Sequence, residues 1–94
     1  MPVVRIEHSV QNFERWKQAF DGDPGNRKRS GVRRYQILRL QNDPNFVMID
    51  LEFDTTGAAE AFVQTMQGIW GGAGKAVMRN PSARIADVVE SKEV

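Results

Sequence analysis

The sequence has no cysteine, a single histidine and no long apolar run. Without cysteine the chain can form no disulfide bond, no thiolate metal site and no cysteine nucleophile. A membrane-spanning helix needs about 18 consecutive apolar residues, and a secretory signal needs an apolar core near the N-terminus. The N-terminal stretch instead carries charges at Arg5 and Glu7. We therefore expect a cytoplasmic protein with no membrane partner.

An excess of charge of one sign is also missing. Thirteen Lys and Arg residues stand against twelve Asp and Glu residues, for a net charge of +1. The total hides an asymmetry, because residues 1–47 carry nine basic and five acidic groups and residues 48–94 carry four and seven. With 40% hydrophobic and 27% charged residues, the composition is typical of one globular domain, which we expect to span residues 1–94.

The first forty residues predict two strands and a helix. Apolar and polar positions alternate over residues 3–10, which is typical of a strand, and one face would hold Val4, Ile6, His8 and Val10. Asn12 stands where a helix N-cap is favoured, and the helix after it would bury Phe13, Trp16 and Phe20. Several helix breakers follow over residues 21–25, and residues 32–40 predict the second strand.

A hairpin is expected in the middle of the chain. Residues 46–54 predict a third strand, and the five residues 41–45 before it form a turn of a length that joins hairpins. This turn would place Leu40 opposite Phe46 and Arg34 opposite Glu52. The more apolar face of the third strand would then lie beneath the helices: Val47, Ile49, Leu51 and Phe53.

The last part of the chain predicts a second helix and a fourth strand. Thr55 or Thr56 can cap the helix, whose buried side would hold Ala59, Phe62, Val63, Met66, Ile69 and Trp70. Glycines after Trp70 interrupt it, a short helical turn over residues 75–78 can follow, and a break at Asn80 and Pro81 leads to a strand over 83–90.

The order of elements is therefore strand, helix, strand, strand, helix, strand. It predicts a ferredoxin-like α+β fold, with a four-stranded antiparallel sheet and both helices on one face.

The other face of the sheet would carry four large apolar residues beside four polar ones. They are Leu38, Leu40, Phe46 and Met48, with Arg34, Gln36, Asp50 and Glu52. A bare apolar face of this size is a liability unless something covers it. We expect a second copy of the chain to cover it, which makes the protein a homodimer packed sheet against sheet.

A basic cluster without acidic residues spans positions 27–39: Arg27, Lys28, Arg29, Arg33, Arg34 and Arg39. Such a cluster can bind phosphate or nucleic acid. Opposite charges on the neighbouring strand, such as Glu52, would remove the open field that such a site needs. We therefore expect no nucleic-acid partner.

The glycine-rich run at residues 71–75 resembles a phosphate-binding loop only superficially, because Ile69 and Ala76 occupy two of its defining positions. The run can end the helix or act as a lid over a cleft. Asp50 and Glu52 lack further ligands in the sequence, and no metal site is expected.

Several segments together carry a family resemblance. They are His8-Ser9-Val10-x-Asn12-Phe13-x-x-Trp16-Lys17-x-x-Phe20, then Gly31, then the turn Asn42-Asp43-Pro44-Asn45 leading into Val47-Met48-Ile49-x-Leu51-Glu52-Phe53, and Ala59-x-x-Phe62. The chain resembles the small dimeric α+β barrel proteins of the antibiotic-biosynthesis-monooxygenase type over about residues 5–70. The resemblance implies that two sheets pair into a barrel and that a ligand lies between each sheet and its helices. It also implies a monooxygenase-like or cyclase-like activity that needs no cofactor.

Five residues are candidates for the site. His8 has an ordinary pKa near neutrality and could accept a proton from an acidic phenol or enol, or could be a buried imidazole bonded to backbone. Trp16, Tyr35 and Trp70 could wall a flat aromatic pocket or simply fill the core. Asn12 could anchor a substrate oxygen or cap the helix.

The leading hypothesis is a cofactor-independent monooxygenase-like or cyclase-like protein acting on a small hydrophobic, aromatic or polyketide-like substrate. The alternative is a dimer without enzymatic activity that binds a ligand or has a stress-associated role.

Overall fold

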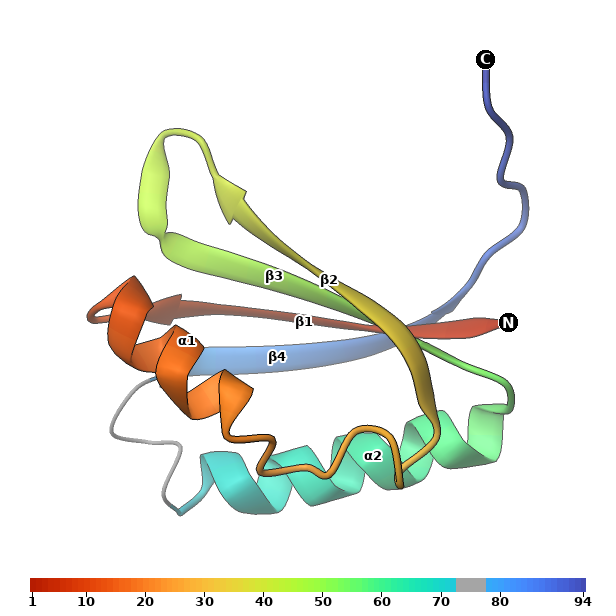
Figure 1. Cartoon of the computed structure of the whole chain (residues 1–94), viewed down its shortest axis with the longest axis horizontal. Coiled ribbons are helices and arrows are strands. Elements are labelled where there is room, and N and C mark those ends of the chain that lie inside the picture. The colour runs from red at the N-terminus through yellow and green to blue at the C-terminus, as the bar shows by residue number, and fades with distance from the viewer. Residues whose placement is uncertain (73–77) are drawn as a thin grey trace.

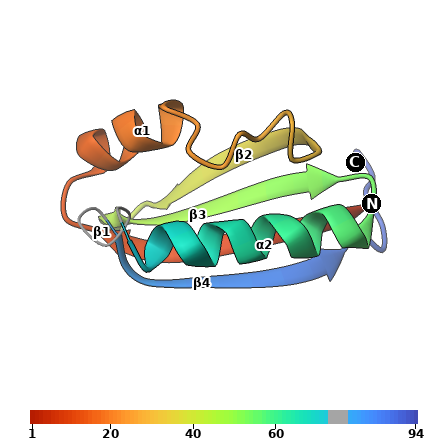
Figure 2. The same cartoon turned by 90° about the horizontal axis from the view of Figure 1, so that it is seen from below.

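The computed structural model describes residues 1–72 and 78–94, and the side chains of 1–72 and 81–94. Its elements are β1 (Pro2–Val10), α1 (Phe13–Asp21), β2 (Val32–Leu40), β3 (Asp43–Phe53), α2 (Thr56–Trp70) and β4 (Met78–Asp87) (Figure 1). The strands form one antiparallel sheet in the order β2-β3-β1-β4. Helix α2 lies along the sheet beside β1, β3 and β4, and α1 lies on the β2 side of the sheet, where its Phe20 packs against Tyr35 (Figure 2). The predicted ferredoxin-like α+β fold is confirmed.

The core lies between the helices and the inner face of the sheet. Every second residue of β1 is buried, as the alternation predicted, and β3 shows the same pattern from Val47 to Phe53. Trp16 of α1 and Ala59 and Phe62 of α2 complete the core. The inner face was therefore assigned correctly from the sequence.

Both helices begin where a side chain can accept from an exposed backbone N–H group. Asn12 Oδ1 accepts from Arg15 N at 3.1 Å, and Thr55 Oγ1 accepts from Ala58 N at 3.1 Å. Each cap satisfies one of the donors that a helix start leaves unpaired. Thr55, and not Thr56, is the cap of α2, which ends at Trp70 before Gly71.

The hairpin register is confirmed along most of its length and wrong at its tip. Arg34 pairs with Glu52 as predicted, but Leu40 lies opposite Asp43 and not Phe46, because the register shifts after Arg39. Strand β3 starts at Asp43, which leaves only residues 41–42 as the turn. The Asp43 side chain accepts from Asn45 N at 3.1 Å, a local turn inside the strand that takes up the extra residues.

Strand β4 starts earlier than the sequence suggested. Asn80 and Pro81 do not break it, since β4 runs from Met78 to Asp87. β4 is an edge strand, where proline is tolerated, and its register with β1 shifts between Glu7 and Ser9, beside the proline. The helical turn considered for 75–78 and the glycine-rich run at 71–75 fall mostly on residues 73–77, which lie outside the described residues, while Met78 belongs to β4. After Asp87 the chain leaves the sheet and projects away from the domain (Figure 1).

Candidate functional site

A cavity of ≈ 200 Å³ lies between the sheet and the helices. Its walls come from β1, β3, α1, α2 and the connection that follows α1. The lining residues are Ile6, His8, Trp16, Ala19, Phe20, Pro24, Gly25, Arg27, Ile49, Leu51, Phe62, Met66, Ile69 and Trp70. A dry cavity of about 150 Å³ is enough to hold benzene, so this space suits a compound of one or two rings.

His8 is the buried titratable group of this cavity. It lies on the inner face of β1 and is 2% exposed. Its Nδ1 is 3.3 Å from the carbonyl oxygen of Ser9, a distance at which the protonated nitrogen donates to that oxygen. This assigns the proton of the neutral ring to Nδ1 and leaves Nε2 with a free lone pair. Burial lowers the pKa of His8, and the bond to Ser9 opposes that shift. His8 is therefore neutral at pH 7 and able to accept a proton.

A series of aromatic rings lines one side of the cavity beside His8. The His8 and Trp16 ring centroids are 5.5 Å apart, and those of Trp16 and Phe20 are 5.3 Å apart. Tyr35 packs edge-on against Phe20 at 5.1 Å but is 43% exposed and does not line the cavity. The structure thus brings His8 and Trp16 together and places Tyr35 behind Phe20.

Trp70, the last residue of α2, also lines the cavity. Its Nε1 is buried and, within the part of the chain that the structure describes, has no hydrogen-bond partner. A buried donor without a partner costs about 1–3 kcal/mol. A ligand oxygen in the cavity is one group that could accept this bond.

Asn12 lies outside the cavity lining. It is exposed, and its side-chain oxygen is occupied by the N-cap bond to Arg15 N. In the structure Asn12 therefore caps α1, the helix that carries Trp16, and does not contact the cavity.

The connection over residues 22–31 contributes to the cavity in a way that the sequence did not reveal. Gly25 is buried against α2, since a Cβ at this position would lie 3.0 Å from Phe62 Cε1 and 3.2 Å from Met66 Sδ. Arg27 lines the cavity, although the sequence placed it in a surface cluster. The helix-breaking residues at 21–25 predicted a turn, but they did not indicate that the connection after α1 folds back over the core.

The remaining cationic side chains of that cluster are partly paired. Arg33 forms an ion pair with Asp54, and Arg34 with Glu52. The guanidinium of Arg39 lies 4.5 Å from the centroid of the Phe13 ring. These contacts reduce the open positive field that phosphate binding would need.

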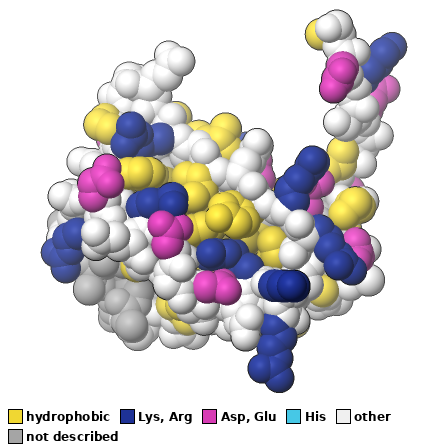
Figure 3. All heavy atoms as spheres, viewed as in Figure 1, with side chains coloured by type: hydrophobic (Ala, Val, Ile, Leu, Met, Phe, Trp, Pro, Cys, Tyr) yellow, Lys and Arg dark blue, Asp and Glu magenta, His cyan; other side chains and the backbone are white. Residues whose placement is uncertain are grey.

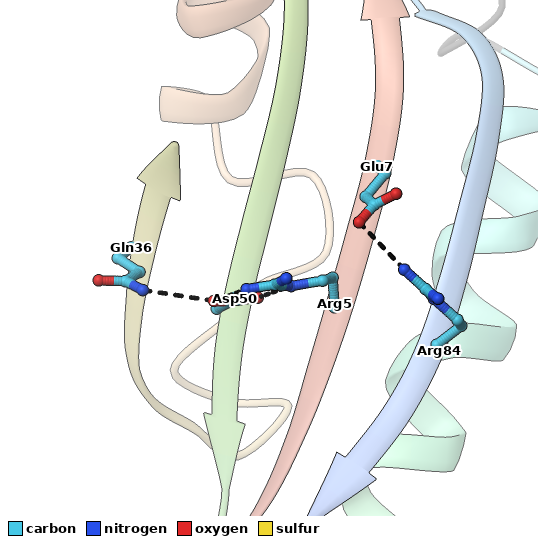
Figure 4. Close-up of polar contacts among 5 residues, drawn as sticks. All are labelled: Arg5, Glu7, Gln36, Asp50 and Arg84. Atoms are coloured by element: carbon cyan, nitrogen blue, oxygen red, sulfur yellow. Dashed lines mark hydrogen bonds and ion pairs between the residues drawn. The ribbon is translucent and has the colours of Figure 1, made fainter. Parts of the chain in front are cut away.

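The outer face of the sheet carries charges in pairs (Figure 4). Arg5 donates two hydrogen bonds to Asp50 at 2.7 and 2.8 Å, and Gln36 donates to the same carboxylate at 3.3 Å. Arg84 donates to Glu7 at 3.0 Å. Through its bonds to Arg5, the pKa of Asp50 is lowered.

No group of three His, Asp or Glu side chains that could hold a metal occurs in the described ranges. No helix in the same ranges is long and apolar enough to cross a membrane.

Comparisons with known proteins identify relatives in structure alone. No family model matches the chain, and no curated protein matches it in sequence. A cofactor-independent oxygenase from Streptomyces nogalater superposes with a TM-score of 0.74 at 12% identity, over 96% of this chain and 94% of the other. A proposed antibiotic biosynthesis monooxygenase from Nitrosomonas europaea gives 0.70 at 19% identity, over 96% and 100%. A dimeric ferredoxin-like protein from an uncultured marine organism gives 0.72 at 12% identity, over the full length of both chains.

The chain therefore has a ferredoxin-like fold, which it shares with proteins of the antibiotic-biosynthesis-monooxygenase type. At 12–19% identity the likeness concerns the fold and not the chemistry, because one fold can carry many unrelated functions.

Proposed function

We propose that this protein is a cofactor-independent monooxygenase-like or cyclase-like enzyme for a small hydrophobic, aromatic or polyketide-like substrate. The observation that carries the proposal is a neutral, buried imidazole on the wall of an otherwise largely apolar cavity. General bases need this combination, since the ring must be unprotonated and within reach of an acidic C–H or O–H group.

The first step would be the same in either reaction. His8 Nε2 removes a proton from an acidic ring CH₂ or enol, which leaves an imidazolium and an enolate. In a cyclase-like reaction the enolate carbon attacks a carbonyl of the same substrate, and the resulting alkoxide takes back the proton from the imidazolium. In a monooxygenase-like reaction it adds dioxygen to give a peroxide, which takes back the proton and loses water. One CH₂ and one O₂ then become one carbonyl and one water.

The other candidate residues would support this step. The Trp16 ring packs beside His8 and offers a flat surface, and Trp70 Nε1 offers a hydrogen bond to a substrate oxygen. Tyr35 would act through Phe20, against which it packs, and Asn12 through the start of α1. We assign these two to positioning.

The alternative, a ligand-binding protein without enzymatic activity, is favoured by the 2% exposure of His8. A base that the substrate cannot reach would be only a structural imidazole. A measurement of proton transfer from a bound substrate therefore distinguishes an enzyme from a ligand-binding protein.

The test is hydrogen–deuterium exchange of the acidic CH₂ group of 2-tetralone, followed by NMR in D₂O. The wild type should accelerate exchange, and His8→Gln should lower the acceleration by about a hundredfold or more. Glu60→Gln changes an exposed residue of α2 that does not line the cavity and should leave the rate unchanged. Binding of 2-tetralone without exchange would favour the alternative, and oxygen uptake would separate a monooxygenase from a cyclase.

We also propose that two copies associate through the outer sheet face. The three ion pairs Arg5–Asp50, Glu7–Arg84 and Arg34–Glu52 neutralise its charges within one protomer. Leu38, Phe46 and Met48 are only half-buried there. A dimeric ferredoxin-like protein has the same fold. A paired, neutral face of this kind can be buried against a second copy without stranding charges.

A further inference from the structure

Arg27 is held in place by both neighbouring segments of the chain. Its backbone N donates to Asp23 Oδ1 at 2.8 Å, and its Nη1 donates to the carbonyl oxygen of Phe20 at 2.8 Å. The guanidinium lies 3.9 Å from the Phe20 ring centroid and 5.1 Å from that of Tyr35. The side chain is 15% exposed, which is low for an arginine. Its position is therefore fixed before any ligand arrives.

The guanidinium still has donors to offer. Asp23 is its counter-ion, but the Nε–Oδ1 distance is 3.5 Å, which is long for a charge-assisted bond. Nη2 has no hydrogen-bond partner in the described part of the chain. Arg27 therefore has a fixed position and an Nη2 group that is available to donate hydrogen bonds to a ligand.

The cavity has an inner end and a mouth. His8 is 2% exposed and marks the inner end. Ala19 and Pro24 line the cavity yet are exposed, so the space opens between the end of α1 and the connection that carries Arg27. A chain of contacts connects the two ends: the His8 ring packs near Trp16, Trp16 packs near Phe20, and the Arg27 guanidinium lies over Phe20. Figure 3 shows hydrophobic side chains gathered in the middle of one face, with charged side chains around them.

We propose that Arg27 is a specificity-determining residue that selects ring compounds bearing a carboxylate. The carboxylate would lie at the mouth against Nη2, and the rings would extend inward along Trp16 and Phe20 toward His8. An arginine fork matches the geometry of a carboxylate better than a lysine does. The substrate class becomes small aromatic acids with an acidic C–H or O–H group at the end away from the carboxylate.

This inference rests on the proposed function, because it uses the same cavity. The test compares two probes of equal size, 2-naphthoate and the neutral 2-naphthamide, by isothermal titration calorimetry. The wild type should bind naphthoate about tenfold more tightly, since a charge-assisted bond is worth more than a neutral one. This comparison needs no variant and does not depend on how a substitution folds.

Variants then assign the preference to Arg27. Arg27→Gln should abolish the tenfold preference by weakening naphthoate binding while the amide is unaffected. Arg29→Gln removes the same group from an exposed position of the same connection and should keep the preference. Equal binding of both probes by the wild type, or an unchanged preference in Arg27→Gln, would overturn the inference and leave the cavity as a ligand site. If neither probe bound at about millimolar concentration, the cavity proposal would fail as well.

Discussion

The two faces of the sheet use the same strands for opposite purposes. The inner face of β1 and β3 is apolar and buried, and its one titratable side chain, His8, has no charged partner among the described residues. The outer face of the same strands is partly exposed, and its charges are paired, as Arg5 with Asp50 and Glu7 with Arg84. One residue of shift along a strand therefore separates a buried apolar environment that holds a neutral imidazole from a partly exposed one in which charges are paired.

The two faces differ in what they contribute to the stability of the folded chain and in how they affect the pKa values of their side chains. Burial of the inner face stabilises the protomer and perturbs the pKa of His8 through desolvation. The ion pairs of the outer face, whose arginines are 42–79% exposed, contribute little to the stability of one chain, because solvent screens them. Their role is better understood as keeping an apolar face neutral.

The largest expected effect is the loss of a buried side chain from the inner face. Leu51 is 1% exposed and lies over the sheet centre, and Leu51→Ala should lower the free energy of unfolding by about 2–5 kcal/mol. Leu38→Ala makes the same chemical change on the outer face, where the side chain is half-buried, and should cost about 1 kcal/mol or less.

Urea unfolding measures both variants in the Met48→Glu background, in which light scattering should give the mass of one chain. Equal losses at Leu51 and Leu38 would show that the two faces do not differ in their contribution to the protomer.

The second prediction concerns association. Wild-type protein at about micromolar concentration should have the mass of two chains, and Met48→Glu should convert it to one chain by burying an unpaired charge at the interface. The far-ultraviolet circular dichroism should not change. Ala61→Glu places the same charge on an exposed position of α2 and should remain dimeric. A monomeric wild type would refute the interface.

The sequence was sufficient for the fold because its signals are local. Alternation placed Val4 and Ile6 inside, caps placed the starts of both helices, and the register expected for the hairpin placed Arg34 against Glu52. The prediction from sequence was wrong where pairing between distant strands overrides a local strand-breaking residue. Pro81 suggests a break, yet the edge strand β4 accommodates it through a shift in register against β1.

The site was only partly accessible from sequence. His8, Trp16 and Trp70 lie on regular elements, so periodicity placed them near one another. Arg27 lies on an irregular connection in which Asp23 and Asn26 have positive φ values of 57° and 50°. No periodic pattern describes such a path, and the packing of Gly25 against Phe62 and Met66 emerges only from the folded chain.

The smallest expected effect is the dependence of stability on pH, which should separate the two faces. Burial lowers the pKa of His8 from 6.5, so its contribution is complete above that pH and is lost as pH falls toward the lowered value. Asp50 has a pKa lowered from 3.8 by Arg5, so its contribution persists until pH falls below that value. Urea midpoints should therefore decline in two stages as the pH falls.

Variants assign each stage to one face. His8→Gln should remove the decline that begins near pH 6.5 and leave the acid stage, and Asp50→Asn should weaken only the acid stage. Persistence of the upper stage in His8→Gln would mean that another group titrates there and that the imidazole is not perturbed by the inner face. Its disappearance would show that a neutral His8 is part of the folded state, as proton abstraction from a substrate in the cavity requires.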